Sequence, residues 1–326
     1  KKGSKATGAD ADEENAPVSW SGPDAAAVEM LNRWIAKMSK VKLPVAETAP
    51  AGTVIYVGYA AIKAGLKVDD ISSPSKEGIR IRIDGNKILI AGQRGEATVR
   101  AVCRFLEEFG CRMFMDGAIG EEYPDLKTIS IDKLEVTEWP AFIHRNMKGP
   151  NWGNSSFKTW NALGGIGVPC AHSWGSWIGQ EMPVTHPEYM ALKPDGSRAK
   201  EGWVCTSNPD LRKYFADRVI AGVEKGAKSK NASLSPTDGI GYCVCKRCSA
   251  QDDPASIEPS SGKMSMSSRY VDFFNEIGTR VAEKYPDSIL SFYCYADYTQ
   301  TPTKFQGKLS PNLCAYIAPL RYSRIH

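Results

Sequence analysis

The sequence predicts an α/β protein, in which a small α+β domain at the amino terminus is followed by an incomplete (β/α)8 barrel of the TIM type. In the first part of the chain, a helix, a strand, a hairpin and a second helix follow one another. In the second part, strands alternate with helices and several strands end in polar or aromatic residues, as in barrels built from βα units. The expected domains are a flexible leader over 1–19, an α/β domain over 20–138 and the barrel over 139–326.

The first domain is predicted from the spacing of its apolar residues. Residues 24–40 place Val28, Leu31, Ile35 and Met38 on one face of a helix. The other elements expected are a strand over 53–58, a hairpin over 79–92 that turns at Asp84-Gly85, and a helix over 96–109 that ends at Gly110.

The second domain is predicted from repeated strand and helix patterns. Helices are expected over 209–225, with Asn208 as N-cap and Pro209 as first residue, and over 266–284. A complete barrel takes about 250 residues, so we expect this one to be truncated at the carboxyl terminus of the chain. The strands expected are 142–147, 165–174, 232–239, 289–298 and 313–320.

Composition excludes several classes of protein. Of all residues 42% are hydrophobic and 24% are charged, and the net charge of +4 comes from basic and acidic residues that are mixed along the chain. No basic stripe could follow a phosphate backbone, so nucleic acid is not an expected partner. No run of about 18 apolar residues occurs, so no membrane span is expected. The motifs of P-loop nucleotide hydrolases, zinc proteases, α/β-hydrolases and dinucleotide-binding folds are absent.

A first group of candidate residues lies near the end of the predicted strand 165–174. His172 and Trp174 combine hydrogen-bonding groups with flat apolar surfaces, and a sugar ring needs both kinds of contact. The alternative is that they pack the rim of the barrel. Arg145, Tyr293 and Tyr295 are the other candidates for substrate binding.

Two carboxylates form a second group, since Asp238 and Asp297 stand at the ends of two predicted strands. Cleavage of a glycosidic bond commonly uses two such groups, one as general acid and the other as base or nucleophile. The alternative is structural, because aspartate before glycine is a common turn former and Asp297 can cap the turn that follows it.

Four of the nine cysteines form a third group: Cys205, and Cys243, Cys245 and Cys248 in the string GYCVCKRC. Four thiolates satisfy the tetrahedral coordination of Zn²⁺, so a structural zinc site is one interpretation. One or two disulfides in an exported protein are the other, and the spacing does not separate the two.

The chain resembles the bacterial family known as domain of unknown function 4838. The resemblance is carried by AHSWGSW, HPEYMALKPDGSR, CTSNPDLRKYFADRV, SPTDGIGYCVCKRC and RYVDFFNEIGTRVAEKYPD, in the order of the family. The first domain looks like the α/β domain that precedes the barrel in α-glucuronidases and β-hexosaminidases, and GQRGEATVRAVCRFLEEFGCRMFMDG is its most recognisable stretch.

This resemblance implies an exported protein with a glycoside-hydrolase-like barrel. The leading hypothesis is a glycoside hydrolase that acts on a complex polysaccharide through Asp238 and Asp297, with no cofactor for catalysis. The second is a non-catalytic carbohydrate-binding or cell-surface assembly protein on the same scaffold.

Overall fold

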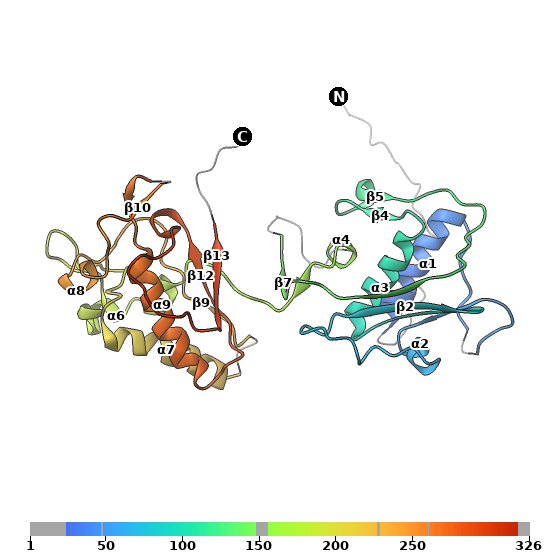
Figure 1. The fold of residues 1–326 in the computed structure, drawn as a ribbon, viewed down its shortest axis with the longest axis horizontal. Helices are drawn as coiled ribbons and strands as arrows, with labels where there is room; N and C mark the ends of the chain where they lie inside the picture. The colour runs from blue at the N-terminus through green and yellow to red at the C-terminus, as the bar shows by residue number, and fades with distance from the viewer. Residues whose placement is uncertain (1–23, 47, 148–155, 227–228, 260, 319–326) are drawn as a thin grey trace, which may run out of the picture. The chain divides into compact units, whose positions relative to one another are not determined.

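The computed structural model describes residues 24–46, 48–147, 156–226, 229–259 and 261–318. The expected leader over 1–19 lies outside these residues. The chain divides into two compact units, the first ending at Ile166 and the second beginning at Gly167. Both are mixed α/β with small sheets, and no sheet closes into a barrel within the described residues (Figure 1).

The first unit is built on a four-stranded sheet in the order β1-β3-β2-β6. Helices α1 and α3 pack on one face, against Ile81 and Ile90, which are paired across β2 and β3. Leu89 and Ala91 point to the other face and pack with α2. The elements of this sheet and its helices are α1 (Ala25–Ser39), β1 (Val54–Val57), α2 (Tyr59–Lys63), β2 (Ile79–Asp84), β3 (Lys87–Gly92), α3 (Gly95–Glu107) and β6 (Glu135–Glu138).

These elements confirm the predicted pattern of the first domain. The hairpin turns between Asp84 and Lys87, with Gly85 at a φ of 59°, a left-handed conformation that favours glycine. Gly110, after α3, has a φ of 92°, as expected of the residue that ends a helix.

The division between the units falls later than the expected boundary at residue 138, because the next residues pack on the first unit. In α4 (Ser156–Trp160), Phe157 and Trp160 are buried in the core beneath α1 and α3. The predicted barrel strand 142–147 is reduced to β7 (His144–Arg145), which pairs antiparallel with β8 (Gly164–Gly165). That prediction was wrong, since a barrel strand would need a parallel neighbour. The unit also contains β4 (Arg112–Met113), η1 (Ala118–Gly120) and β5 (Glu121–Glu122).

The second unit contains a parallel sheet of three strands in the order β13-β12-β9. Helices α7 and α9 lie together on one side of it (Figure 1). Phe292 of β12 stacks on Phe274 of α9 with ring centroids 4.6 Å apart. The elements of this layer are α7 (Pro209–Glu224), β9 (Ala232–Ser233), α9 (Ser267–Ala282), β12 (Leu290–Cys294) and β13 (Leu313–Ile317), all within segments that the sequence predicts.

The predicted strand 165–174 is wrong beyond Gly165. Residues 166–174 form no strand, and side chains of the parallel sheet hold this stretch instead. Tyr316 of β13 donates to the carbonyl of Val168 at 3.2 Å, and Tyr293 of β12 donates to that of Cys170 at 2.9 Å. Pro169 lies inside this stretch and has no N–H to give to a ladder.

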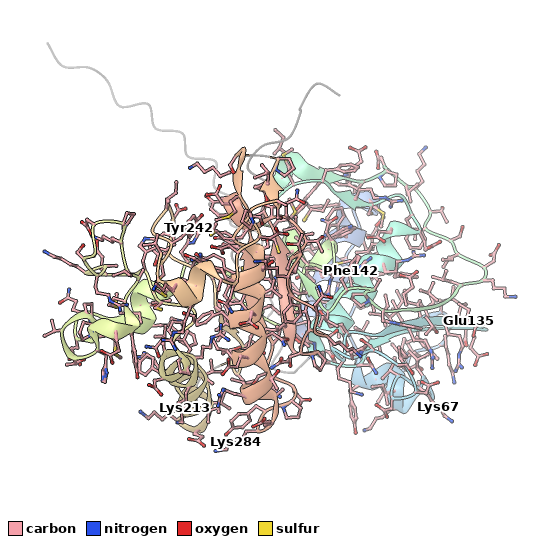
Figure 2. The ribbon with its side chains drawn as sticks, turned by 60° about the vertical axis from the view of Figure 1, so that its left-hand side comes forward. Lys67, Glu135, Phe142, Lys213, Tyr242 and Lys284 are labelled. Carbon is pink, nitrogen blue, oxygen red and sulfur yellow. The ribbon has the colours of Figure 1, made fainter. Side chains whose placement is uncertain are left out.

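Short elements complete the second unit around the sheet. The charged side chains of Lys213, on α7, and of Lys284, after α9, extend outward (Figure 2). Among the described residues, no helix has both the length and the apolar character needed to cross a membrane. The short elements are α5 (Trp174–Ile178), α6 (Met182–Thr185), η2 (Pro187–Tyr189), α8 (Lys246–Ser249), β10 (Ile257–Glu258), β11 (Lys263–Met264) and η3 (Ala296–Tyr298).

Candidate functional site

Three of the predicted site residues come together beyond the carboxyl ends of β9 and β12. These strands are parallel and adjacent, so the residues that follow them emerge at one edge of the sheet. His172 Nε2 lies 3.7 Å from Asp238 Oδ1, and the hydroxyl of Tyr295 donates to the same oxygen at 3.3 Å. Asp238 therefore stands between an imidazole and a phenol.

The ring of His172 has a defined orientation. Its Nδ1 lies 2.7 Å from the carbonyl oxygen of Pro236, so Nδ1 carries the proton and donates it there. That bond leaves Nε2 facing Asp238. The ring centroid of His172 lies 5.2 Å from that of Tyr293 and 5.7 Å from that of Tyr295, so two tyrosines flank the imidazole.

Asp238 is open to solvent, with 66% of its side chain exposed. Gly239 follows it with a φ of 96°, and the N–H of Gly239 donates to Asp238 Oδ1 at 3.0 Å. Partial burial, and secondarily the negative charge of Asp238, raise the pKa of Tyr295, so the phenol stays protonated and able to donate. The group offers a solvent-facing carboxylate with two hydrogen-bonding neighbours.

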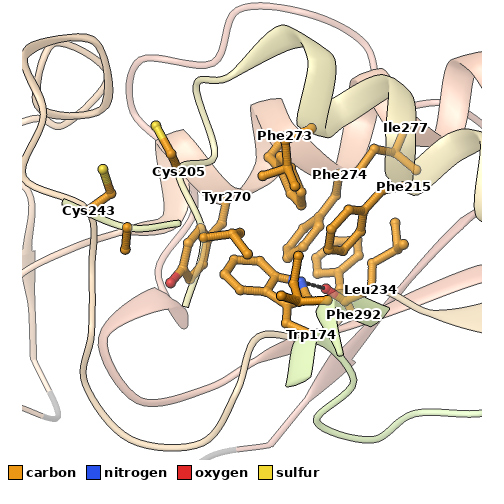
Figure 3. Close-up of a cluster of buried hydrophobic side chains, with 14 of the residues drawn as sticks. Trp174, Cys205, Phe215, Leu234, Cys243, Tyr270, Phe273, Phe274, Ile277 and Phe292 are labelled. Carbon is orange, nitrogen blue, oxygen red and sulfur yellow. Dashed lines mark hydrogen bonds between the residues drawn. The ribbon is translucent and has the colours of Figure 1, made fainter. Parts of the chain in front are cut away.

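Two further predicted site residues, Trp174 and Arg145, lie elsewhere. Trp174 is fully buried and its indole N–H donates to the carbonyl of Leu234 at 2.7 Å, so it belongs to the aromatic core (Figure 3). Arg145 belongs to the first unit, where it donates to Glu77 Oε1 at 2.8 Å and to the carbonyl of Phe142 at 2.6 Å. For both residues, packing and structural hydrogen bonds account for what the side chain does.

Asp297 is also buried, with 4% of its surface exposed. Its Oδ2 accepts from the hydroxyl of Tyr242 at 3.1 Å, and its carbonyl accepts from the N–H of Met266 at 2.8 Å. Burial raises the pKa of Tyr242 above its ordinary value, and the neighbouring carboxylate of Asp297 raises it further. These contacts give Asp297 a structural role, in which it holds Tyr242 and the start of α9. Its predicted catalytic role stays a prediction.

Trp203 and Tyr242, which the sequence did not single out, lie on the loop system that carries Asp238. Their rings meet edge to face with centroids 5.6 Å apart. Tyr242 stands directly before Cys243 in the string GYCVC, and Trp203 stands two residues before Cys205. The signal that could have found them is therefore an aromatic residue beside each part of the cysteine group.

The four predicted cysteines form one group, which we call the cysteine group: Cys205, Cys243, Cys245 and Cys248. Their sulfurs all lie within 4.8 Å of one another, and three of the residues are buried. Cys205 Sγ lies 3.7 Å from Cys245 Sγ and 3.8 Å from Cys248 Sγ. A disulfide needs sulfurs about 2.05 Å apart, whereas a tetrahedral ion with bonds of about 2.3 Å to sulfur keeps its ligands about 3.8 Å apart. The group could therefore bind a metal ion, and all four cysteines are free thiols here.

Backbone N–H groups donate to two sulfurs of the cysteine group, and the thiols also bond to one another. The backbone N–H of Leu192 donates to Cys243 Sγ at 3.3 Å, and the N–H of Cys248 donates to Cys245 Sγ at 3.5 Å. Hydrogen bonds from the thiols of Cys205 and Cys243 hold the pKa of Cys248 far below its ordinary value. The pKa of Cys243 is raised by its hydrogen bonds with Cys205 and Cys248. Both effects concentrate charge on the sulfur of Cys248.

Two arginines from the helices fix the segments that carry the cysteine group. Arg269 of α9 donates to the carbonyl of Cys243 at 2.7 Å and pairs with Asp252, both side chains being 4% exposed. Arg212 of α7 donates to the carbonyl of Thr206 at 2.6 Å. Cys205 and Cys243 lie side by side at one edge of the aromatic core (Figure 3).

A separate open hollow lies at the opposite, amino-terminal end of β9. Trp177, Arg218 and Lys230 are among the residues that line it. None of the predicted site residues lines it, so it is distinct from the group around Asp238.

The model of the family described as "Domain of unknown function (DUF4838)" matches residues 115–326, more than half of the sequence. The chain belongs to this family. The match begins inside the first unit and includes every residue of the cysteine group and of the group around Asp238.

Other comparisons add little. No match was found among curated proteins. Among solved structures, one similar chain is described as a "GH138 enzyme targeting pectin rhamnogalacturonan II". It is 11% identical, with a TM-score of 0.24, and the alignment covers 86% of this chain and 24% of that one. A similarity of this size supports no conclusion about fold or function.

Proposed function

We propose that this member of the DUF4838 family is a glycoside-hydrolase-like protein that acts on a complex polysaccharide at the carboxyl edge of the parallel sheet in the second unit. The observation that carries the proposal is the exposed carboxylate of Asp238, with His172 at 3.7 Å and Tyr295 at 3.3 Å. A carboxylic acid in that place could give a proton to a leaving sugar oxygen and take one back from water.

The aromatic neighbours support a sugar as the ligand. Tyr293 and Tyr295 present rings with centroids 6.0 Å apart beside His172, and half-buried tyrosines supply both flat apolar surface and hydroxyl groups. The arrangement of the strands also supports an incomplete (β/α)8 barrel, because β9, β12 and β13 are parallel neighbours in chain order with helices on one face. In such barrels the active site lies at the carboxyl ends of the strands. Export from the cell is proposed on the family resemblance alone.

Replacement of Asp238 by Asn tests this proposal. Asparagine keeps the shape of the side chain and cannot exchange a proton, so turnover of a polysaccharide should fall at least 100-fold, within the range of general acid–base catalysis, while binding persists. Release of reducing ends from a panel of polysaccharides is the measurement, with the exposed helix residue Val184 changed to Ala as control. Unchanged turnover in Asp238→Asn would remove Asp238 from the mechanism.

A second candidate function is carbohydrate binding without catalysis, with a role in cell-surface assembly. The observation that favours it is the burial of Asp297, which leaves Asp238 without the open second carboxylate that the predicted mechanism needs. This candidate predicts that the wild-type protein binds a polysaccharide, in an affinity measurement, without releasing new reducing ends.

We propose further that the cysteine group binds a structural Zn²⁺. The sulfur separations of 3.7 Å and 3.8 Å match the edges of a tetrahedral zinc site, and four protein ligands leave no open position for chemistry. Arg212 and Arg269 already bond to the segments that carry Cys205 and Cys243, so the ion would cross-link loops that the arginines hold in place.

Elemental analysis of the protein, together with thiol titration under non-reducing conditions, tests the zinc proposal. The expected result is about one zinc per chain, falling to near zero in Cys248→Ser. A metal-free protein whose thiols are lost to oxidation would favour disulfides instead.

A further inference from the structure

Asp238 lies at the tip of a loop, where it stands next to an exposed residue. The loop runs from Pro236, after β9, to Tyr242, before the first cysteine of GYCVC. Asp238 and Ile240 point to solvent, with 66% of the side chain of Asp238 and 66% of Ile240 exposed. Gly239 between them adopts a left-handed conformation with a φ of 96°. Besides the contacts of Asp238 with Tyr295 and His172, the residues on both sides of the tip help to determine where the carboxylate stands.

Contacts on both sides of Asp238 join this loop to residues 202–203, in addition to the ring contact between Trp203 and Tyr242. The hydroxyl of Thr237 donates to the carbonyl of Gly202 at 2.6 Å. The indole of Trp203 lies directly on the backbone of Gly241, where a Cβ atom would come within 2.4 Å of its ring. These contacts flank Asp238 on both sides in the sequence.

The same two segments lead directly to the cysteine group. Trp203 is two residues before Cys205, and Gly241 is two residues before Cys243. A metal ion held by Cys205 and Cys243 would join the two segments at the point where they leave the contact between Thr237, Trp203 and the loop. A cross-link of this kind reduces the number of conformations that the connected loop can adopt.

We infer that Thr237, Gly241 and Trp203 are positioning residues, which hold the Asp238 loop on the segment leading to Cys205 so that metal binding fixes the carboxylate at the sheet edge. The inference rests on the proposed function for the importance of Asp238 and on the proposed metal for the cross-link, whereas the path from the cysteine group to the loop stands on the contacts. The metal is thus assigned a second role beyond stapling the fold: it orders the glycan site.

Amide hydrogen exchange tests the link without any substrate. Protein loaded with zinc is compared with protein stripped by a chelator, and exchange is measured in peptides covering 236–242. The expected result is protection of these peptides in the loaded protein and its loss after stripping, with no change in the sheet of the first unit. Protection that does not respond to the metal would overturn the inference, whether or not a glycan ligand has been found.

Variants of Trp203 separate positioning from general stability. Trp203→Ala removes the surface under Gly241, and a displacement of about 1 Å can cost about 100-fold in rate. We expect Trp203→Ala to keep its zinc and to lose protection over 236–242, with turnover or glycan affinity reduced at least tenfold. Trp203→Phe keeps a flat ring there and should restore most of both.

A paired substitution covers the case in which Trp203→Ala does not fold. Gly241→Ala places a methyl group against the indole and should also loosen the loop, whereas Gly241→Ala combined with Trp203→Leu should recover part of the protection because the smaller side chain makes room. Equal effects of Phe and Ala at position 203, or no recovery in the pair, would contradict a positioning role. If the protein binds no polysaccharide at all, the proposed function fails, while the exchange results still decide the link between metal and loop.

Discussion

At the residue scale, burial separates two aspartates that look alike in the sequence. Asp238 and Asp297 both stand at the ends of predicted strands, and either could be a catalytic carboxylate or a turn residue. In the structure 66% of the Asp238 side chain is exposed, whereas Asp297 is 4% exposed and accepts from Tyr242. The sequence could not separate them, because Tyr242 is distant in the chain and its hydroxyl meets Asp297 only after the loop has folded.

The two aspartates should therefore differ in their effect on stability. Asp297→Ala leaves the buried hydroxyl of Tyr242 without its acceptor and should lower the free energy of unfolding by about 1–3 kcal/mol. Asp238→Ala changes an exposed side chain and should stay within about 0.5 kcal/mol of the wild type. Urea denaturation measures both. A larger loss for Asp238→Ala than for Asp297→Ala would contradict the assignment.

The same reasoning applies to Trp174 and the cysteines. The flat ring of Trp174 near the end of a predicted strand makes it a candidate for sugar binding, but its indole N–H donates to the carbonyl of Leu234 inside the core. The spacing of the cysteines left metal and disulfides open. The choice depends on sulfur distances of 3.7 Å and 3.8 Å, which only the folded chain defines.

At the scale of elements, local signals succeeded where they act within the element itself. Helix α7 begins where Asn208 and Pro209 predict, and Asn208 Oδ1 accepts from the N–H groups of Asp210 and Leu211. The β2–β3 hairpin turns at Gly85, where glycine allows the left-handed conformation that the turn needs. In both cases the residues that cause the structure lie within a few positions of it, so the sequence alone reveals them.

Strand predictions failed where pairing depends on distant partners. The segments 142–147 and 165–174 have apolar residues suited to a strand, but β7 and β8 are two residues each and, within the part of the chain that the structure describes, pair with no strand but each other. The chain beyond β8 is instead held by hydroxyl groups of Tyr293 and Tyr316, which no local pattern reveals.

The cap of α7 gives a test at this scale. Asn208→Ala removes an acceptor for two N–H groups at the helix start and a donor to the carbonyl of Glu188, so we expect a loss of about 1–2 kcal/mol in the free energy of unfolding. Lys213→Ala, on the exposed side of the same helix, serves as the matched control. Equal stability of the two variants in thermal denaturation would show that the cap does not stabilise α7.

At the scale of the whole molecule, the first compact unit ends at Ile166, whereas the boundary expected from the sequence lies at residue 138. Phe157 and Trp160 extend the first unit past residue 138, because their side chains complete its core. The parallel order of β9, β12 and β13 agrees with repeated βα units, and the barrel itself remains a proposal.

The central claim is that His172, Asp238 and Tyr295 form one carbohydrate site in the second unit. The chain has four histidines, so the imidazole resonances of the protein can be observed individually by NMR during titration with the oligosaccharide selected from a polysaccharide screen. We predict that the resonances of His172 shift with increasing ligand, that those of His144 and His186 do not, and that Asp238→Ala weakens the response. A saturable ligand that leaves His172 unchanged and shifts another histidine would contradict this claim.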